Sequence, residues 1–176
     1  MNPNNHLIDC FETHHGVLLN ISGKGVFIIG EPGIGKSSLA LDCLYNGHSL
    51  IADDCIDFKV NHTQSVIGSC PPMLAGLLHT RELGLITVSD FFSAQTWQSE
   101  IQLDYVVHLK KEAIFISAIK TEQDTYSICN HDFPLLTLDT TTPASLINRI
   151  NTWINMQSNH NTAIETLEQR QHAQMK

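Results

Sequence analysis

The sequence predicts an α/β domain in which a mixed sheet is flanked by helices. Two observations support this fold class. Residues 26–29 are apolar and rich in β-branched side chains, which is typical of a buried strand, and they lead directly into a glycine-rich loop. After that loop, apolar residues recur at helical spacing up to a stop signal at Asn46 and Gly47. A strand, a glycine loop and a helix therefore follow one another in the first third of the chain.

Length and composition limit the class of protein. The chain has 176 residues, of which 42% are hydrophobic and 16% are charged, and this fits one globular domain. We expect the domain to span residues 1–156 and to be followed by a polar tail, mobile or helical, at residues 157–176. The formal net charge of -8 at pH 7 argues against nucleic-acid binding.

The cysteine spacing and the hydropathy pattern indicate the cellular compartment in which the protein is expected. The five cysteines are widely spaced, and neither C-x-x-C nor H-E-x-x-H occurs, so we expect a reduced, cytoplasmic protein without a structural zinc site. Apolar runs are too short to cross a membrane and no signal peptide is visible, so membrane insertion is not expected.

The first predicted elements form a hairpin. Residues 16–21 are expected to form a strand, residues 22–25 a glycine-rich turn, and residues 26–29 the second strand. The glycine loop lies at the far end of this hairpin, and a helix over residues 36–46 follows it.

The loop fits the phosphate-binding pattern G-x-x-x-x-G-K-[ST], with Gly30, Gly35, Lys36 and Ser37 in register. Glycines let consecutive backbone N–H groups turn inward around an anion, and the positive end of the next helix faces the same point. Lys36 adds a charge that reaches the β- and γ-phosphates, and the Ser37 hydroxyl is a ligand for Mg²⁺. The residues expected to bind a nucleotide are Gly30, Glu31, Pro32, Gly33, Ile34, Gly35, Lys36, Ser37 and Ser38.

The next predicted strand, over residues 48–54, ends in two adjacent carboxylates, Asp53 and Asp54. A strand that returns beside the one preceding the loop brings its end close to bound phosphates. One carboxylate can then act as general base toward an attacking hydroxyl, and the other can hold Mg²⁺ directly or through water. A surface Asp-Asp turn is the alternative interpretation.

The second half of the chain is predicted to be mainly β. Apolar and polar residues alternate most clearly at 101–109, which is typical of a half-buried strand. The other expected elements are a short strand near Leu7 and Ile8, a hairpin (56–60 and 65–69), an apolar segment (74–79), a segment leading into a strand (80–88), a cap or turn at Ser89 and Asp90, strands at 113–118, 125–128 and 135–138, and a helix over 143–156.

Several segments together resemble the catalytic domain of the HPr kinase/phosphorylase family. They are residues 14–18, 30–37, 47–54 and 77–86. That family phosphorylates a serine of a small sugar-phosphotransfer carrier protein. Its fold is the P-loop variant shared with phosphoenolpyruvate carboxykinase, in which a hairpin precedes the loop. The resemblance implies a P-loop kinase domain of this type that uses ATP and Mg²⁺, acts on an HPr-like protein and forms homo-oligomers.

The resemblance also implies catalytic roles for individual residues. Asp53 takes the proton from the acceptor serine, and His15 lies beside the site and orients or tunes that carboxylate. Lys36 keeps the role derived above, and Arg81 matches an arginine in a loop that the family uses in catalysis.

Departures from the family pattern concern the metal. The family has a Mg²⁺-contacting glutamate two residues before the arginine, where this chain has His79, and an acid after the Lys-Ser pair, where this chain has Ser38. Glu82 is therefore a candidate metal ligand together with Ser37 and Asp54.

Three other functions remain open from the sequence: a small-molecule kinase, a nucleotide-binding regulatory module with little or no catalysis, and a simple nucleotide triphosphatase.

Overall fold

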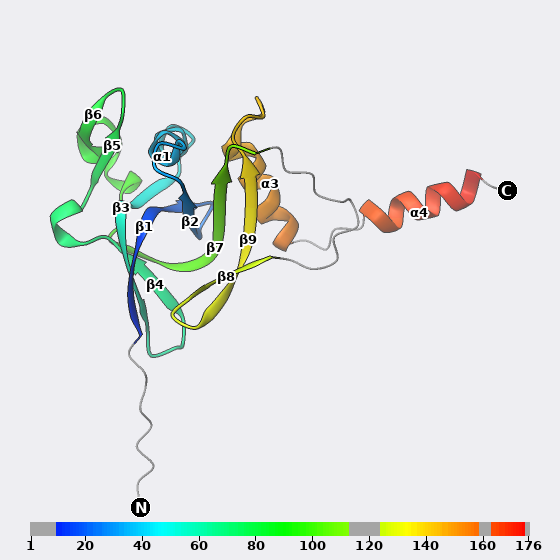
Figure 1. The fold of residues 1–176 in the computed structure, drawn as a ribbon, viewed down its shortest axis with the longest axis horizontal. Coiled ribbons are helices and arrows are strands. Elements are labelled where there is room, and N and C mark those ends of the chain that lie inside the picture. The colour runs from blue at the N-terminus through cyan, green and yellow to red at the C-terminus, as the bar shows by residue number, and fades with distance from the viewer. Residues whose placement is uncertain (1–9, 113–123, 159–162, 175–176) are drawn as a thin grey trace, which may run out of the picture.

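The computed structural model describes residues 10–112, 124–158 and 163–174. They form a strongly curved mixed sheet with flanking helices (Figure 1). The elements are β1 (Phe11–Ile21), β2 (Lys24–Gly30), α1 (Lys36–Tyr45), β3 (Ser49–Val60), β4 (Val66–Ser69), β5 (Leu77–Thr80), β6 (Gly84–Thr87), α2 (Val88–Phe91), β7 (Glu100–Lys110), β8 (Thr125–Ile128), β9 (His131–Asp139), α3 (Leu146–Ser158) and α4 (Ala163–Gln174), with short 3₁₀ turns at Pro72–Leu74 and Ala94–Thr96. Helices α1 and α3 pack on one face of the sheet (Figure 1).

The main sheet closes on itself. Its seven strands follow the order β2-β1-β3-β4-β7-β9-β8, and β2 also pairs with β7, so that β2, β1, β3, β4 and β7 complete a barrel-like ring. The β2–β7 and β7–β9 pairs are parallel and the other pairs of this sheet are antiparallel. The predicted mixed α/β architecture is confirmed, whereas the closure of the ring was not predicted.

Side-chain alternation along the strands divides the apolar residues between two cores. Val17 and Leu19 belong to the core shared with α1 and α3, whereas Leu18 between them belongs to the core on the opposite face of the sheet. On that second face the rings of Phe27 and Phe58 meet edge to face, with centroids 5.1 Å apart. Strands β1, β2, β3 and β7 therefore contribute to both cores, whereas β4 contributes Val66 to the second core only.

The predicted hairpin before the glycine loop is confirmed. Ser22 and Gly23 both have positive φ angles, of 55° and 83°, as a tight two-residue connection between antiparallel strands requires. Strand β1 begins at Phe11, five residues before the predicted start, because its first half pairs with β3. The glycine loop follows β2 and precedes α1, as expected.

Strand β3 differs from the prediction in two ways. It runs without interruption from Ser49 to Val60, so Asp53 and Asp54 lie inside a strand rather than at its end. It also pairs with β1 and β4, and β1 separates it from β2. Because β1 is long enough to pair with both neighbours, it occupies the place beside β2 that the sequence suggested for β3.

Smaller differences concern the helices. Helix α3 begins at Leu146 rather than at residue 143, because Thr141 and Thr142 donate hydrogen bonds to the Asp139 carboxylate in a preceding turn. Helix α2 starts at Val88, so Ser89 and Asp90 lie inside it rather than capping it.

Several other predicted elements can be placed. The segments over 74–88 form the β5–β6 hairpin, and the strands predicted at 125–128 and 135–138 are β8 and β9. The strands predicted near Leu7 and Ile8 and at 113–118 lie outside the described residues. Part of the predicted tail forms α4, and the proposed boundary at residue 156 stays a prediction. In the described part of the chain, no helix combines the length and apolar character needed to cross a membrane.

Gly25 offers a test of the ring closure, because it lies where β2 meets β7. A β-carbon at this position would overlap the backbone carbonyl group of Gln102. The substitution Gly25→Ala should therefore force β2 and β7 apart and lower the free energy of unfolding by about 1–3 kcal/mol, measured by denaturant titration. Lys59→Ala, at an exposed position of β3, is the control and should change stability by about 0.5 kcal/mol or less. An unchanged Gly25→Ala midpoint would argue against the β2–β7 pairing.

Candidate active site

A cleft of about 530 Å³ opens between the glycine loop, the start of α1, the middle of β1 and β3, and the tip of the β5–β6 hairpin. It brings together residues from positions 15 to 82 of the chain. Its lining consists of His15, Gly16, Pro32, Gly33, Gly35, Lys36, Ser37, Ser38, Asp53, Asp54, His79, Arg81 and Glu82. Every residue predicted to be catalytic or to bind a metal lies in this lining.

The glycine loop turns tightly because Gly30, Gly33 and Gly35 all have positive φ angles, of 149°, 77° and 110°. A β-carbon on Gly30 would lie 2.7 Å from the carbonyl oxygen of Leu109, so the loop begins directly against β7. Of the predicted nucleotide-binding residues, Gly30, Glu31 and Ile34 do not line the cleft, and Ile34 is buried in the core shared with α1.

Lys36 is the first residue of α1 and its side chain curls back over the loop. Its Nζ donates to the carbonyl oxygens of Gly30, at 2.9 Å, and Glu31, at 3.2 Å. Burial lowers the pKa of this ammonium group, and the carboxylates of Asp53 and Asp54 partly oppose that shift. The loop therefore holds a buried cation at the floor of the cleft.

Asp53 is buried and both of its oxygens accept hydrogen bonds. Oδ1 accepts from the Ser37 hydroxyl at 3.0 Å, and Oδ2 accepts from the backbone N–H of His79 at 2.9 Å. Burial raises the pKa of this carboxyl group, and the two hydrogen bonds oppose the rise. A fixed carboxylate that holds a proton more readily than usual is suited to proton transfer.

Asp54 shares the cleft because its backbone leaves the regular strand conformation. In a regular strand two successive side chains point to opposite faces, but Asp54 has a φ of 76° and lines the same cleft as Asp53. Its exposed carboxylate lies 3.4 Å from Nδ1 of His15, which is paired with Cys55 across the β1–β3 ladder. His15 is therefore at the site as expected, but the carboxylate that it contacts is Asp54 rather than Asp53.

The β5–β6 hairpin brings Arg81 and Glu82 to the rim of the cleft opposite the glycine loop. A β-carbon on Gly33 would lie 2.6 Å from Nη2 of Arg81, so the guanidinium rests against the loop backbone. Arg81 forms no ion pair within the described part of the chain, so its charge faces the cleft without a carboxylate partner.

His79 is the functional position whose contribution the sequence did not indicate. Its backbone N–H, rather than its exposed side chain, fixes Asp53. A backbone donor carries no residue signature, and only the β3–β5 contact reveals it. Ser37, Asp53, Asp54 and Glu82 all line the cleft, and hydroxyl and carboxylate oxygens are the ligand type that Mg²⁺ prefers.

Comparison with known proteins shows which family the chain is similar to. The family model described as the HPr Serine kinase C-terminal domain matches residues 9–172. The HPr kinase/phosphorylase of Bacillus licheniformis is 36% identical over 126 residues, which is 70% of this chain and 41% of that protein. The enzyme of the same name from Bordetella avium is 41% identical over 97 residues, which is 55% of this chain and 32% of that protein. The chain thus spans well under half the length of these relatives.

A solved structure extends the similarity to most of the fold. The Hpr(Ser) kinase/phosphatase from Coxiella burnetii superposes with a TM-score of 0.75 and 27% sequence identity. The match covers 92% of this chain and 97% of that one.

The raised pKa of Asp53 leads to a prediction about stability. Folding raises the pKa of Asp53, so the folded protein binds this proton more tightly than the unfolded chain does. The resulting stabilisation of the folded state is present at acidic pH and is lost as the pH rises through the folded pKa. Asp53→Asn keeps an acceptor for the His79 N–H and should therefore be at least as stable as wild type at pH 7, with an advantage that shrinks toward acidic pH. Thermal unfolding measured across this pH range tests it.

Asp90→Asn in the exposed helix α2 is the matched control for this substitution. A stability difference between wild type and Asp53→Asn that does not vary with pH would contradict the raised pKa.

Proposed function

Because this chain belongs to the family of HPr serine kinase C-terminal domains, we propose that it is an ATP-dependent kinase acting on a serine of an HPr-like carrier or another partner protein. One observation carries the proposal: the buried Asp53 carboxylate, fixed by Ser37 and His79, faces the glycine loop across one cleft. That arrangement places a proton acceptor beside a site suited to phosphates.

The glycine loop is proposed to be a P-loop that holds the ATP phosphates. Its backbone N–H groups and the positive end of α1 favour an anion at this point. Lys36 donates to the carbonyl oxygens of Gly30 and Glu31, and phosphate oxygens are better acceptors for an ammonium group than neutral carbonyls. Nucleotide binding would therefore redirect Lys36 from the loop backbone to the phosphates.

Oxygen ligands from this chain fit a bound magnesium ion. Ser37 Oγ, Asp54 and Glu82 would hold Mg²⁺, which supplies charge neutralisation on the phosphate oxygens when it is bound. Ser37 is in contact with Asp53, so the ligand and the proton acceptor are positioned together. Glu82 replaces the carboxylate that the family resemblance places at His79.

Asp53 is proposed to accept the proton of the acceptor hydroxyl as the phosphoryl group is transferred. Its two hydrogen bonds keep the carboxylate in place, so its orientation costs little free energy during the reaction. His15 would act on Asp54 rather than on the base, because that is the carboxylate it contacts. Arg81 would stabilise negative charge on the transferring group from the opposite rim.

Other parts of the proposal follow from the family. We expect an HPr-like acceptor, a cytoplasmic location and a homo-oligomeric state. The alternatives are a small-molecule kinase, a regulatory nucleotide-binding module and a simple triphosphatase. They differ in the molecule that receives the phosphate of ATP.

Lys36→Ala tests the nucleotide site. Loss of the one buried ammonium group in the cleft should reduce binding of a non-hydrolysable ATP analogue by about 100-fold or more in calorimetry with Mg²⁺ present. Lys59→Ala, which removes an exposed lysine outside the cleft, should bind the analogue as wild type does. If Lys36→Ala bound the ATP analogue as tightly as wild type does, the glycine loop would not be the nucleotide site.

Asp53→Asn tests the chemical step. It should bind the nucleotide with little change and lose about 10²- to 10⁴-fold of the transfer rate, because positioning remains while the proton acceptor is gone. The measurement is transfer of labelled phosphate from ATP to a purified HPr-like carrier, analysed for phosphoserine.

The same assay separates the alternatives. Label on a metabolite indicates a small-molecule kinase, release of free phosphate alone indicates a triphosphatase, and intact bound ATP indicates a regulatory module. Each of these outcomes would overturn the proposed protein kinase, and undiminished transfer by Asp53→Asn would overturn the role of the base.

A further inference from the structure

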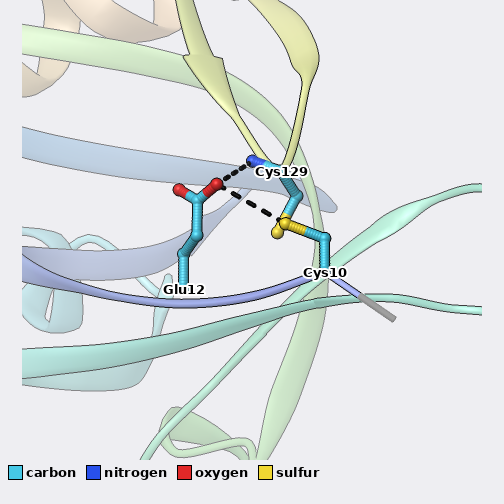
Figure 2. Close-up of side chains that lie close together, drawn as sticks. All are labelled: Cys10, Glu12 and Cys129. Carbon is cyan, nitrogen blue, oxygen red and sulfur yellow. Dashed lines mark hydrogen bonds between the residues drawn. The ribbon is translucent and has the colours of Figure 1, made fainter. Parts of the chain in front are cut away.

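A second group of reactive side chains lies outside the cleft, where the first half of β1 meets the turn between β8 and β9. Its members are Cys10, Glu12 and Cys129, and their ligand atoms all lie within 4.8 Å of one another. Figure 2 shows the two sulfur atoms close together, with the Glu12 carboxylate facing them. The mechanism proposed above uses none of these residues.

The fold brings the three together from distant positions. Cys10, Glu12 and His14 are two residues apart, so they lie on the same side of the chain as it enters and follows β1. Cys129 lies in the two-residue turn between β8 and β9, where it and Asn130 have φ angles of 50° and 59°. Its backbone N–H donates to Oε1 of Glu12 at 2.9 Å, which fixes the turn against β1.

The spacing of the donor atoms is compatible with tetrahedral zinc. Metal–ligand lengths of about 2.3 Å for sulfur and about 2.0 Å for oxygen separate neighbouring sulfur and oxygen ligands by about 3.5 Å. Sγ of Cys10 lies 3.5 Å from Oε1 of Glu12. Two such sulfur ligands are about 3.8 Å apart, which the limit of 4.8 Å for this group allows.

The Glu12 carboxylate is also oriented by a hydrogen bond with His14. Nε2 of His14 lies 2.7 Å from Oε2 of Glu12, and the His14 ring is held edge-on by Phe27, Phe58 and Tyr126. Oε1 therefore points to the two sulfurs while Oε2 is occupied by an oriented ring. Hydrogen-bonded support of this kind is typical of metal-binding carboxylates.

The chemistry of the group favours a cation over a disulfide. Two thiolates and a carboxylate form a donor set that a thiophilic divalent cation neutralises as a unit, whereas a disulfide would use only the two sulfurs. Cys129 is buried, but Cys10 and Glu12 are only partly buried, which leaves a path for an ion.

We propose that Cys10, Glu12 and Cys129 form a site for a thiophilic divalent cation, Zn²⁺ foremost, with His14 as the residue that orients Glu12. Binding replaces the two thiol protons, which pass to the solvent, and leaves the fourth coordination position to water. The ion would tie the start of β1 to the β8–β9 turn. The site is independent of the proposed kinase function and holds or fails without it.

The test uses the full-length chain, reduced and freed of metal with a chelator, with Mg²⁺ in excess to occupy oxygen-only sites. Titration with Co²⁺ should give thiolate-to-cobalt charge-transfer bands and the intense visible bands of a tetrahedral site at one ion per chain, and Zn²⁺ should remove them. Zn²⁺ should also raise the unfolding temperature. Absence of the charge-transfer bands in wild type would overturn the proposal whatever the variants do.

Variants locate the site. Cys10→Ser and Cys129→Ser should each abolish the charge-transfer bands or weaken Zn²⁺ binding by more than 100-fold, and His14→Gln should weaken it by about 10- to 100-fold. Cys70→Ser, which removes a half-buried thiol elsewhere, is the matched control and should bind Zn²⁺ as wild type does.

Two outcomes contradict the assignment. Bands that persist in Cys129→Ser and disappear in Cys70→Ser would place the thiolate ligands elsewhere. A Cys10–Cys129 disulfide found by mass spectrometry, together with no Zn²⁺ uptake by the reduced chain, would show a redox pair instead of a metal site.

Discussion

The hydrogen bonds to Asp53 join the three parts of the cleft. Ser37 at the start of α1 donates to one carboxylate oxygen, and the backbone of β5 donates to the other. Burial makes a charged carboxylate costly, and without these two donors the cost of keeping Asp53 ionised would be larger. The glycine loop, β3 and the β5–β6 hairpin therefore meet at one side chain, and the same side chain is the proposed proton acceptor.

The closed sheet makes this positioning rigid. Strand β1 pairs with β2 on one side and β3 on the other. It therefore fixes the position of the loop after β2 relative to the carboxylates on β3. Asp54 departs from regular strand geometry with a φ of 76°, at a cost on the order of 1 kcal/mol for a residue that tolerates this region. The departure turns both neighbouring carboxylates toward the cleft, and strain of this kind is common at functional sites.

Strand β1 thus carries chemistry on both of its faces. The His15 side chain borders the cleft, whereas Glu12 and His14, together with Cys10 just before the strand, lie on the side that meets the β8–β9 turn. Alternation along one strand separates these two groups, so a change on one side need not alter the other. The family model matches residues 9–172, which include both the cleft residues and the Cys10, Glu12 and Cys129 group.

The sequence by itself determined the local features: the β1–β2 hairpin, the glycine loop with Lys36 and Ser37, and the two carboxylates, since each depends on residues close together in the chain. Only the tertiary structure decided that β3 continues past Asp54, that His15 contacts Asp54, that the His79 backbone holds Asp53, and that Cys10 and Glu12 meet Cys129. One of those contacts joins Glu12 and Cys129, which are 117 positions apart. The partners also include a backbone N–H and a turn that no short pattern specifies. Local periodicity reports which face of an element is buried, but strand order and ring closure decide what that face meets.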